Sequence, residues 1–178
     1  MLVSIERDDF MAIEIRTIKK TDSAKPFRDF ICELINEKVY IQINKKPTLH
    51  EEQVWLTDMK KGIKEGYIVW LGAWDGKKLI ASTHARKGLW NEQNNAGIGI
   101  SVLKKYRAKG LGEKLLRMII TVAKKKLKPK NIFLSVAVPN VPARSLYKKI
   151  GFKKFARFPK WAQRGKKYMD VLYMLLTK

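Results

Sequence analysis

Residues 102–116 constrain the fold more than any other part of this sequence. They read VLKKYRAKGLGEKLL, which indicates the end of a strand, a short loop with two glycines and the start of an amphipathic helix. The first turn of a helix exposes backbone N–H groups without partners, and the helix dipole adds about half a positive charge there. Gly110 and Gly112 remove side chains that would keep a ligand off this backbone, and Arg107 and Lys109 add charge. We therefore predict an anion cradle suited to a phosphate.

The loop matches neither of two common phosphate-binding motifs. A P-loop needs Gly-x-x-x-x-Gly-Lys-Ser/Thr and a dinucleotide fingerprint needs Gly-x-Gly-x-x-Gly, and the chain has neither here. The alternative interpretation is a glycine-loosened turn in front of a lysine-rich, solvated helix. The residues of the loop alone leave both interpretations open.

The composition predicts a single domain over residues 1–178. Hydrophobic residues make up 46% of the chain, which argues against disorder and allows a substantial core. No apolar run approaches the ~20 residues of a membrane span. The first ten residues carry three acidic side chains and lack the apolar core of a signal peptide, so we expect a cytoplasmic protein with no membrane partner. Met1 and Met11 are both candidate starts.

Few residues are available for metal or disulfide chemistry. Cys32 is the single cysteine, which excludes an internal disulfide and a cysteine-cluster metal site. The two histidines, His50 and His84, are too few for a histidine-rich site. We therefore expect no bound metal.

The formal net charge of +22 is unevenly distributed. Residues 1–95 hold 16 Lys and Arg against 14 Asp and Glu, whereas residues 96–178 hold 22 against only Glu113 and Asp170. Nearly all of the excess lies in the half that carries the loop. This asymmetry predicts a polyanionic ligand or partner, including weak association with nucleic acid or a ribosomal surface. The alternative is a lysine-coated surface that serves solubility.

Hydrophobic periodicity and turn signals predict eleven elements in the order β-α-α-β-β-β-α-β-α-β-β. Strands are expected at residues 12–18, 67–74, 79–90, 96–103, 131–138, 153–162 and 167–176. Helices are expected at residues 24–35, from a capping box at Thr48 to Ile63, from Leu111 to before Pro129, and at 140–150. The helix after the loop should bury one face, formed by Leu111, Leu115, Met118, Ile119 and Val122.

Two motifs in residues 96–152 resemble those of the GNAT superfamily of acetyl-CoA-dependent N-acetyltransferases. Residues 107–112, RAKGLG, match the family's Gln/Arg-x-x-Gly-x-Gly/Ala loop. The second signature, Asn-x-x-Ala-x-x-Leu-Tyr-x-x-x-Gly-Phe, is matched at Asn140, Ala143, Leu146-Tyr147 and Gly151-Phe152. The resemblance implies an α/β fold, layered as α+β, with a GNAT-like mixed central sheet whose fourth and fifth strands splay apart.

The resemblance also implies contacts with acetyl-CoA as co-substrate. The backbone of residues 108–113 would hold the pyrophosphate, and the fourth strand would pair with the pantetheine amides. Lys109, Lys148 or Lys149 would meet the 3′-phosphate. Asn140 would bond the pantetheine, and Ala143 would leave room for it. The expected binding residues are Ile100, Ser101, Val102, Arg107, Ala108, Lys109, Gly110, Leu111, Gly112, Glu113, Asn140, Ala143, Tyr147 and Lys149.

The family reaction is direct attack of an amine on the acetyl carbonyl. The resemblance implies that a backbone N–H near Val102 donates to the oxyanion and that Tyr147 is the general acid for the leaving thiolate. Many relatives carry a glutamate on the fourth or fifth strand, but the matching positions here are Gly97 and Ser135. The base is therefore open, and the substrate-side candidates are Glu33, Glu37, His84, Glu92 and Asp170.

Three functions agree with the sequence. The first is an N-acetyltransferase whose acceptor is a protein amine, N-terminal or lysyl, or a small amine such as a polyamine. The missing glutamates favour an α-amine, because its pKa of ~7.7–8.0 leaves more of it neutral than the ~10.4 of lysine. The second is a catalytically weak acetyl-CoA-binding sensor, and the third is a basic nucleic-acid-binding or ribosome-associated protein. A homodimer is also compatible with the sequence.

Overall fold

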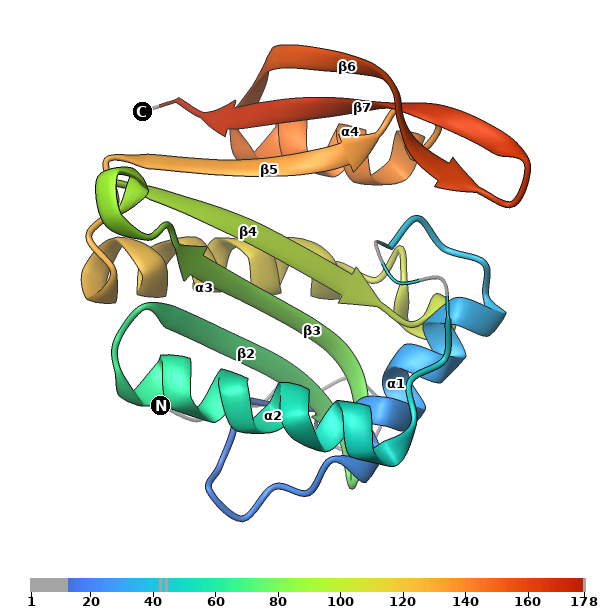
Figure 1. Cartoon of the computed structure of the whole chain (residues 1–178), viewed down its shortest axis with the longest axis vertical. Helices are drawn as coiled ribbons and strands as arrows, with labels where there is room; N and C mark the ends of the chain where they lie inside the picture. The colour runs from blue at the N-terminus through green and yellow to red at the C-terminus, as the bar shows by residue number, and fades with distance from the viewer. Residues whose placement is uncertain (1–12, 42, 44, 178) are drawn as a thin grey trace.

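Figure 1 shows the computed structural model of the chain, which describes residues 13–41, 43 and 45–177. The predicted strand start at Ala12, the candidate starts Met1 and Met11 and the acidic N-terminal segment lie outside the described residues. The elements follow the predicted order. They are β1 (Glu14–Arg16), α1 (Lys25–Asn36), α2 (Leu49–Lys64), β2 (Ile68–Asp75), β3 (Lys78–Lys87), β4 (Asn95–Val102), α3 (Leu111–Lys126), β5 (Asn131–Ala137), α4 (Val141–Ile150), β6 (Phe152–Arg164) and β7 (Lys167–Leu176), with the short 3-10 turns η1 (Trp90–Glu92) and η2 (Lys104–Tyr106) on either side of β4.

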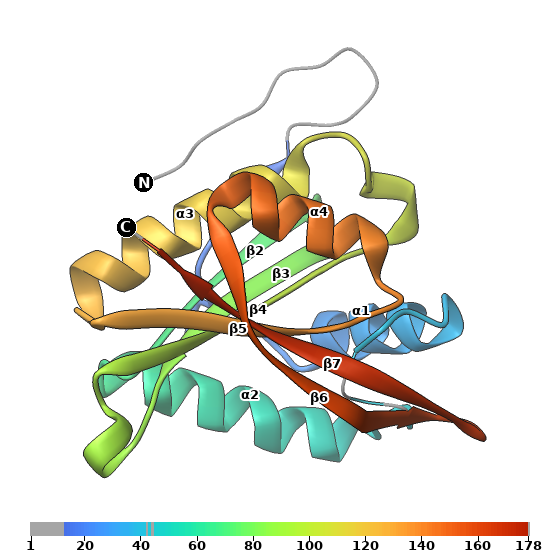
Figure 2. The same ribbon diagram turned by 90° about the horizontal axis from the view of Figure 1, so that it is seen from above.

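One seven-stranded sheet runs through the molecule in the order β1-β2-β3-β4-β5-β7-β6. Each neighbouring pair is antiparallel except β4 and β5, which run parallel. Figure 2 shows α3 and α4 on one face of the sheet and α1 and α2 on the other. The predicted mixed α/β architecture, with helices layered on both faces of a central sheet, is confirmed.

The sheet divides at its centre because β4 and β5 pair over only three residues. The parallel register joins residues 95–97 to residues 131–133 and then stops. Beyond Gly97 the two strands diverge toward their C-terminal ends, as Figure 1 shows. This divergence is the predicted splay of the fourth and fifth strands. It leaves backbone edges in the middle of the sheet that the β4–β5 ladder does not satisfy.

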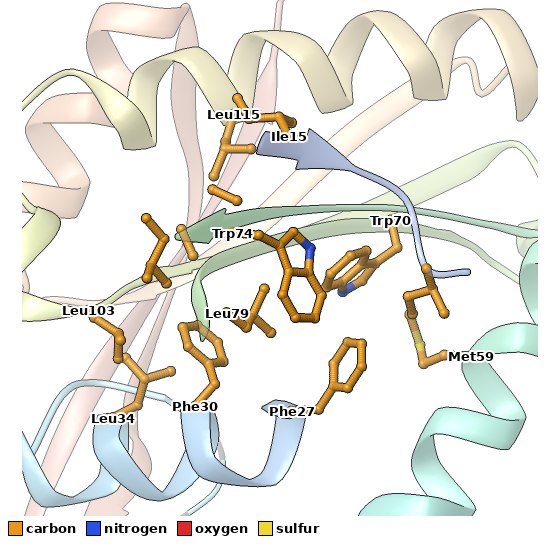
Figure 3. Close-up of a cluster of buried hydrophobic side chains, with 14 of the residues drawn as sticks. Ile15, Phe27, Phe30, Leu34, Met59, Trp70, Trp74, Leu79, Leu103 and Leu115 are labelled. Carbon is orange, nitrogen blue, oxygen red and sulfur yellow. The ribbon is translucent and has the colours of Figure 1, made fainter. Parts of the chain in front are cut away.

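The hydrophobic core on the α1 and α2 face is aromatic. The ring centre of Phe27 lies 5.6 Å from that of Trp70 and 5.7 Å from that of Trp74, and all three side chains are buried. Figure 3 shows these rings packed with Leu34 of α1 and Met59 of α2. Burying such large rings contributes more to stability than burying any other side chains, and it fixes both helices on the sheet.

Three local predictions differ from the structure. The strand expected at residues 79–90 ends at Lys87, because the chain turns at Gly88, where a Cβ atom would lie 2.5 Å from the Glu92 carbonyl oxygen. Trp90 lies instead in η1 and is 86% exposed. The strand expected to end at residue 162 continues to residue 164. The buried face of α3 is wider than predicted, because the helix packs across β2, β3 and β4. It buries Leu116, Ile120 and Ala123, whereas Met118 and Val122 are half-buried.

Candidate functional site

The start of α3 is shaped to receive an anion. Gly110, the residue before the helix, has φ 81°, a left-handed conformation that glycine adopts without strain, and no side chain caps the helix. The first helical bond runs from the N–H of Lys114 to the carbonyl of Gly110 at 3.0 Å. The N–H groups of residues 111–113 therefore precede the helical ladder. A Cβ atom on Gly110 would meet nothing within 4 Å, so the backbone here is open. This geometry fits a phosphate group.

The charged side chains around the cradle are held in ion pairs. Arg107 donates from Nε to the Val102 carbonyl at 2.8 Å and pairs with Glu37, the residue after α1. Glu37 also accepts from the N–H of Lys104 at 2.8 Å. Lys149 of α4 donates to Glu113 at 2.6 Å, and this bond, with that from Arg117, lowers the pKa of the Glu113 carboxyl. The predicted phosphate ligands Arg107 and Lys149 thus brace the loop and tie α4 to α3.

Three elements meet beside the cradle. A Cβ atom on Gly112 would lie 3.6 Å from the Leu146 side chain of α4 and 3.7 Å from the Val102 side chain of β4. Gly112 itself lies in the first turn of α3 rather than in the loop. The start of α3 and the second half of α4 therefore meet at the C-terminal end of β4, where the strands have splayed. At the start of α4 the Asn140 side-chain oxygen accepts from the N–H of Ala143 at 3.4 Å, as a helix cap.

The register of β3 and β4 decides which backbone groups of β4 face the splay. The N–H of Leu103 donates to the carbonyl of Ile80 at 3.0 Å, and Ala81 lies opposite Val102. Ala81 and Val102 are therefore a non-hydrogen-bonded pair, and the N–H and C=O of Val102 point away from β3. With a two-residue repeat, Ile100 points the same way and Ser101 points toward β3. The backbone of Ile100 and Val102 thus faces the opening between the strands.

Tyr147 lies on the buried side of α4. Its side chain is only 7% exposed, and its ring makes an edge contact with Phe152 at 6.1 Å between centroids. Burial raises the pKa of the phenol to about 12, so the hydroxyl stays protonated at neutral pH. A protonated hydroxyl in this position can donate a hydrogen bond or a proton, but it cannot serve as a base.

The face of the sheet that α1 and α2 cover, called here the second face, carries one imidazole beside β4. His84 of β3 lies opposite Trp70 of β2 and Gly99 of β4, so it shares their face. A Cβ atom on Gly99 would lie 2.6 Å from Cε1 of His84, which shows that the ring lies directly over the glycine. Burial, with the nearby Arg86 charge, lowers the pKa of His84 to about 4. The imidazole is therefore neutral at pH 7.

The family model of the acetyltransferase (GNAT) family matches residues 30–152 of the chain. That span includes the cradle, the splayed strands and α4. The chain belongs to the GNAT family. The GNAT loop and the second GNAT signature of the sequence therefore lie where the geometry brings α3, β4 and α4 together.

Among curated proteins the chain matches segments of several GNAT acetyltransferases. It is 35% identical over 83 residues to the L-amino acid N-acetyltransferase AaaT of Escherichia coli, covering 47% of this chain and 51% of that protein. It is 41% identical over 56 residues to an N-alpha-acetyltransferase of Sulfurisphaera tokodaii, covering 32% of this chain and 34% of that protein. The chain thus spans about half the length of the first relative and about a third of the second.

Solved structures reproduce the whole fold. The ribosomal-protein-S5-alanine acetyltransferase of Vibrio fischeri superposes with a TM-score of 0.82 at 16% identity, covering 97% of this chain and 95% of that chain. The putative acetyltransferase yncA of Salmonella typhimurium, solved with its cofactor acetyl-CoA, superposes with a TM-score of 0.78 at 16% identity, covering 92% of both chains. At these identities the likeness concerns the GNAT fold.

The positions that hold a glutamate in many GNAT proteins cannot supply a carboxylate here. Gly97 lies beneath the Phe133 ring, and a Cβ atom on it would approach the ring to 3.3 Å. Ser135 lies on β5 opposite Tyr173, whose ring stacks on that of Phe133 at 6.3 Å. Aromatic side chains thus occupy the second face where the family pattern has an acid.

The other predicted base candidates lie in ion pairs or away from the splay. Glu33 pairs with Lys78 at 2.8 Å, and Glu37 is the anchor of the η2 loop already described. Glu92 lies in η1, before the N-terminal end of β4, whereas the strands splay toward the C-terminal end. Asp170 accepts from the N–H of Lys160 at 2.9 Å and from Arg157, and these bonds lower the pKa of its carboxyl. Of the five candidates, the structure brings His84 beside the splaying part of β4.

One carboxylate was missed by the sequence analysis. Glu52 of α2 is only 5% exposed, and burial raises the pKa of its carboxyl to about 7. It lies in helical phase with the buried Leu56 and Met59, so it points toward the sheet on the second face. Glu52 lies next to the capping box, and acidic residues in a first helical turn are usually explained by their interaction with the helix dipole. Its phase with the apolar stripe is the signal that could have found it.

No helix among residues 13–41 and 45–177 is long and apolar enough to cross a membrane. No group of three or more His, Cys, Asp or Glu side chains in these residues could hold a metal ion.

Proposed function

We propose that residues 1–178 form one GNAT domain that transfers an acetyl group from acetyl-CoA to an α-amine. One observation carries the proposal: the open start of α3, the edge of β4 beyond its three-residue ladder with β5, and the α4 helix meet around Gly112. A phosphate cradle alone would suit many ligands. A cradle beside a split sheet suits a long ligand that has a phosphate end and an amide-bearing arm, as acetyl-CoA has.

The residues present fit acetyl-CoA on its own chemistry. The N–H groups at the start of α3, behind Gly110, would bind the pyrophosphate. The outward-facing backbone of Ile100 would pair with the pantetheine amides, as a strand pairs with a neighbour. Asn140 keeps its amide nitrogen for the same arm, since its oxygen caps α4. When bound, acetyl-CoA supplies an activated acyl group with a thiolate leaving group.

Two groups would assist the transfer. The N–H of Val102 points away from β3 and would donate to the negative charge that develops on the acetyl oxygen. The Tyr147 hydroxyl, kept protonated by burial, would give its proton to the sulfur as the thiolate leaves. On the second face, His84 and Glu52 are the two groups that would receive a proton from the amine, either directly or through water.

The weak basicity of His84, the base candidate beside the splay, supports an α-amine as acceptor. At pH 7.4 roughly a fifth to a third of an α-amine is neutral, against roughly 0.1% of a lysine side chain. An imidazole with a pKa of about 4 is too weak a base to remove the proton from a lysine ammonium. The relatives' names agree, because a free L-amino acid and a protein N terminus both present an α-amine. The high positive charge of the chain favours a ribosome-associated protein acceptor over a polyamine, which it would repel.

Transfer of labelled acetyl to defined acceptors tests the proposal. The acceptors are a peptide with a free N terminus and blocked lysine, the same peptide with a blocked N terminus and free lysine, alanine, and spermidine. We expect label in the first peptide or in alanine. Label confined to the lysine peptide or spermidine would overturn the α-amine assignment. If the chain binds acetyl-CoA but labels no acceptor above the level of a Tyr147→Phe variant, the sensor function is favoured.

A further inference from the structure

The hairpin of β6 and β7, residues 152–176, carries a second concentration of basic and aromatic side chains, which meets the transferase site only at Tyr173. It holds seven Lys and Arg residues and a single acidic residue, Asp170. All seven basic side chains are exposed. The hairpin forms one edge of the sheet, two strands beyond the splay. We call its cluster of rings, formed by Phe155, Phe158, Trp161 and Tyr173, the ring platform.

The rings of the platform touch one another in a continuous row. Phe158 lies 4.8 Å from Trp161 and 5.1 Å from Tyr173 between ring centres, and Phe155 lies 6.1 Å from Tyr173. The outer rings face solvent, since Phe155 is 58% exposed and Trp161 is 62% exposed. Large exposed aromatic side chains in contact with each other are uncommon on a protein surface that has no partner.

Two irregularities in β6 put Phe155 and Trp161 outside the β6–β7 ladder. Lys154 pairs with Met174 and Ala156 with Tyr173, so Phe155 is an extra residue without a partner on β7. Between Phe158 and Ala162 three residues of β6 oppose one residue of β7, and Trp161 is one of the three. A β-bulge of this kind re-aims side chains and ends strand pairing at a sheet edge. The bulges therefore add Phe155 and Trp161 to Phe158 and Tyr173, the two platform rings whose residues pair in the ladder.

The second bulge is held by the hairpin's only acid. Asp170 accepts from the N–H of Lys160 at 2.9 Å and from Nε of Arg157 at 2.8 Å. Both bonds keep the carboxylate inside the hairpin. The remaining Lys and Arg side chains face solvent without a hairpin carboxylate to balance them. A rigid row of rings is thus surrounded by uncompensated positive charge.

We infer that the β6–β7 hairpin binds single-stranded nucleic acid, with bases stacked on Phe155 and Trp161 and phosphates on the surrounding lysines and arginines. Unpaired bases present a ring face and a phosphate at every nucleotide, which matches alternating rings and cations. A second copy of this chain is disfavoured, because it would bring two strongly positive hairpins together. A duplex is disfavoured as well, because its bases are already stacked. The inference does not depend on the transferase reaction.

Fluorescence anisotropy with labelled U20, T20 and a 20-base-pair duplex tests the inference on the full chain. We expect U20 or T20 to bind at least tenfold more tightly than the duplex. Trp161→Ala and Phe155→Ala should each weaken single-strand binding about tenfold and leave its salt dependence unchanged, since stacking releases no counterions. A preference for U20 over T20 would assign the partner as RNA, and no preference would leave the chemistry as single-stranded nucleic acid.

Matched variants distinguish binding at the hairpin from nonspecific attraction to the positive charge of the whole chain. Lys153→Gln, Lys154→Gln and Lys166→Gln together should reduce the slope of log affinity against log salt by about 1 to 2. The same three-charge change at the exposed end of α3, Lys124→Gln, Lys125→Gln and Lys126→Gln, should change it less, and Trp90→Ala should change neither quantity. Three results would overturn the inference. They are an equal reduction of the salt slope in the α3 variant, duplex binding as tight as single-strand binding, and a dimer that Trp161→Ala dissociates in sedimentation. Unfolding midpoints and acetyl-CoA affinity that match the parent show that each variant is folded.

Discussion

The two candidate sites beside β4 use different chemical groups. Toward the splay, the candidate donor site consists of backbone: the N–H groups behind Gly110 and the outward-facing groups of Val102. On the second face, the candidate acceptor site consists of side chains: the His84 ring over Gly99 and the buried Glu52. Backbone groups keep their chemistry whatever the neighbouring side chains become. The comparison predicts that donor binding depends on a few glycines, whereas the side chains of the acceptor side set specificity.

A carboxylate at the cradle is the strongest test of the donor side. Gly110→Glu should abolish measurable acetyl-CoA binding, a loss of more than about a hundredfold, because it places a negative charge where the pyrophosphate would bind. The measurement is isothermal titration calorimetry with acetyl-CoA. Gly165→Glu is the matched control: Gly165, in the β6–β7 turn, also has a positive φ and open space around its Cβ position. Near-normal binding by Gly110→Glu would remove the cradle from the donor site.

Tyr147→Phe separates binding from chemistry on the same side. It removes only the hydroxyl, so the ring's packing on Phe152 remains. We expect kcat to fall by roughly a hundredfold or more, as for loss of a general acid, with the acetyl-CoA dissociation constant within about twofold. Tyr168→Phe, at an exposed tyrosine of β7, should leave kcat unchanged. An unchanged kcat in Tyr147→Phe would move the proton donor to another group.

The donor side could be predicted from the sequence because its signals are local. The loop around Gly110, the capping residue Asn140 and the left-handed stop at Gly151 each act on neighbours within a few positions. Alternating apolar residues similarly predicted the strands and their order along the chain, but not their order in the sheet. The splay could not be derived from periodicity, because apolar residues continue through both strands beyond the point where their pairing stops. It came from the family resemblance.

The acceptor side could not be assembled from the sequence because it depends on register and helix phase. His84 becomes a neighbour of Gly99 only through the β3–β4 register, and Phe133 covers Gly97 only through the β4–β5 register. Glu37 looked like a substrate-side acid, but the fold brings it to Arg107, seventy positions away. Long-range pairing of this kind leaves no mark in a local pattern.

Glu52→Gln tests the acceptor side through pH dependence. Burial raises the pKa of Glu52 to about 7, so between about pH 4.5 and 7 the folded chain holds a proton that the unfolded chain has lost. The stability contribution of this group therefore falls as pH rises through that window. Glu52→Gln should be more stable than the parent by about 1 to 3 kcal/mol at pH 8 and show little difference at pH 4.5, as measured by urea unfolding.

The same variant reports on catalysis. If Glu52 receives the amine proton, kcat/KM of the parent should rise with pH through about 7, and Glu52→Gln should lose about tenfold and flatten that rise. Glu65→Gln, at the exposed C-terminal end of the same helix, is the control for charge. A profile that keeps its inflection in Glu52→Gln would assign it to another group and leave Glu52 with a role in stability alone.

Gly99→Ala should give the smallest effect and the sharpest distinction between the two sides. The new methyl would lie 2.6 Å from Cε1 of His84, so the imidazole must rotate away while the backbone of β4 stays paired with β3. We expect kcat/KM for the acceptor to fall a few-fold, with acetyl-CoA affinity unchanged. In a double-mutant cycle, Gly99→Ala should cost nothing further once His84→Ala has removed the ring. Additive losses would mean that Gly99 acts through the backbone, and the division of β4 into a backbone side and a side-chain side would fail at that residue.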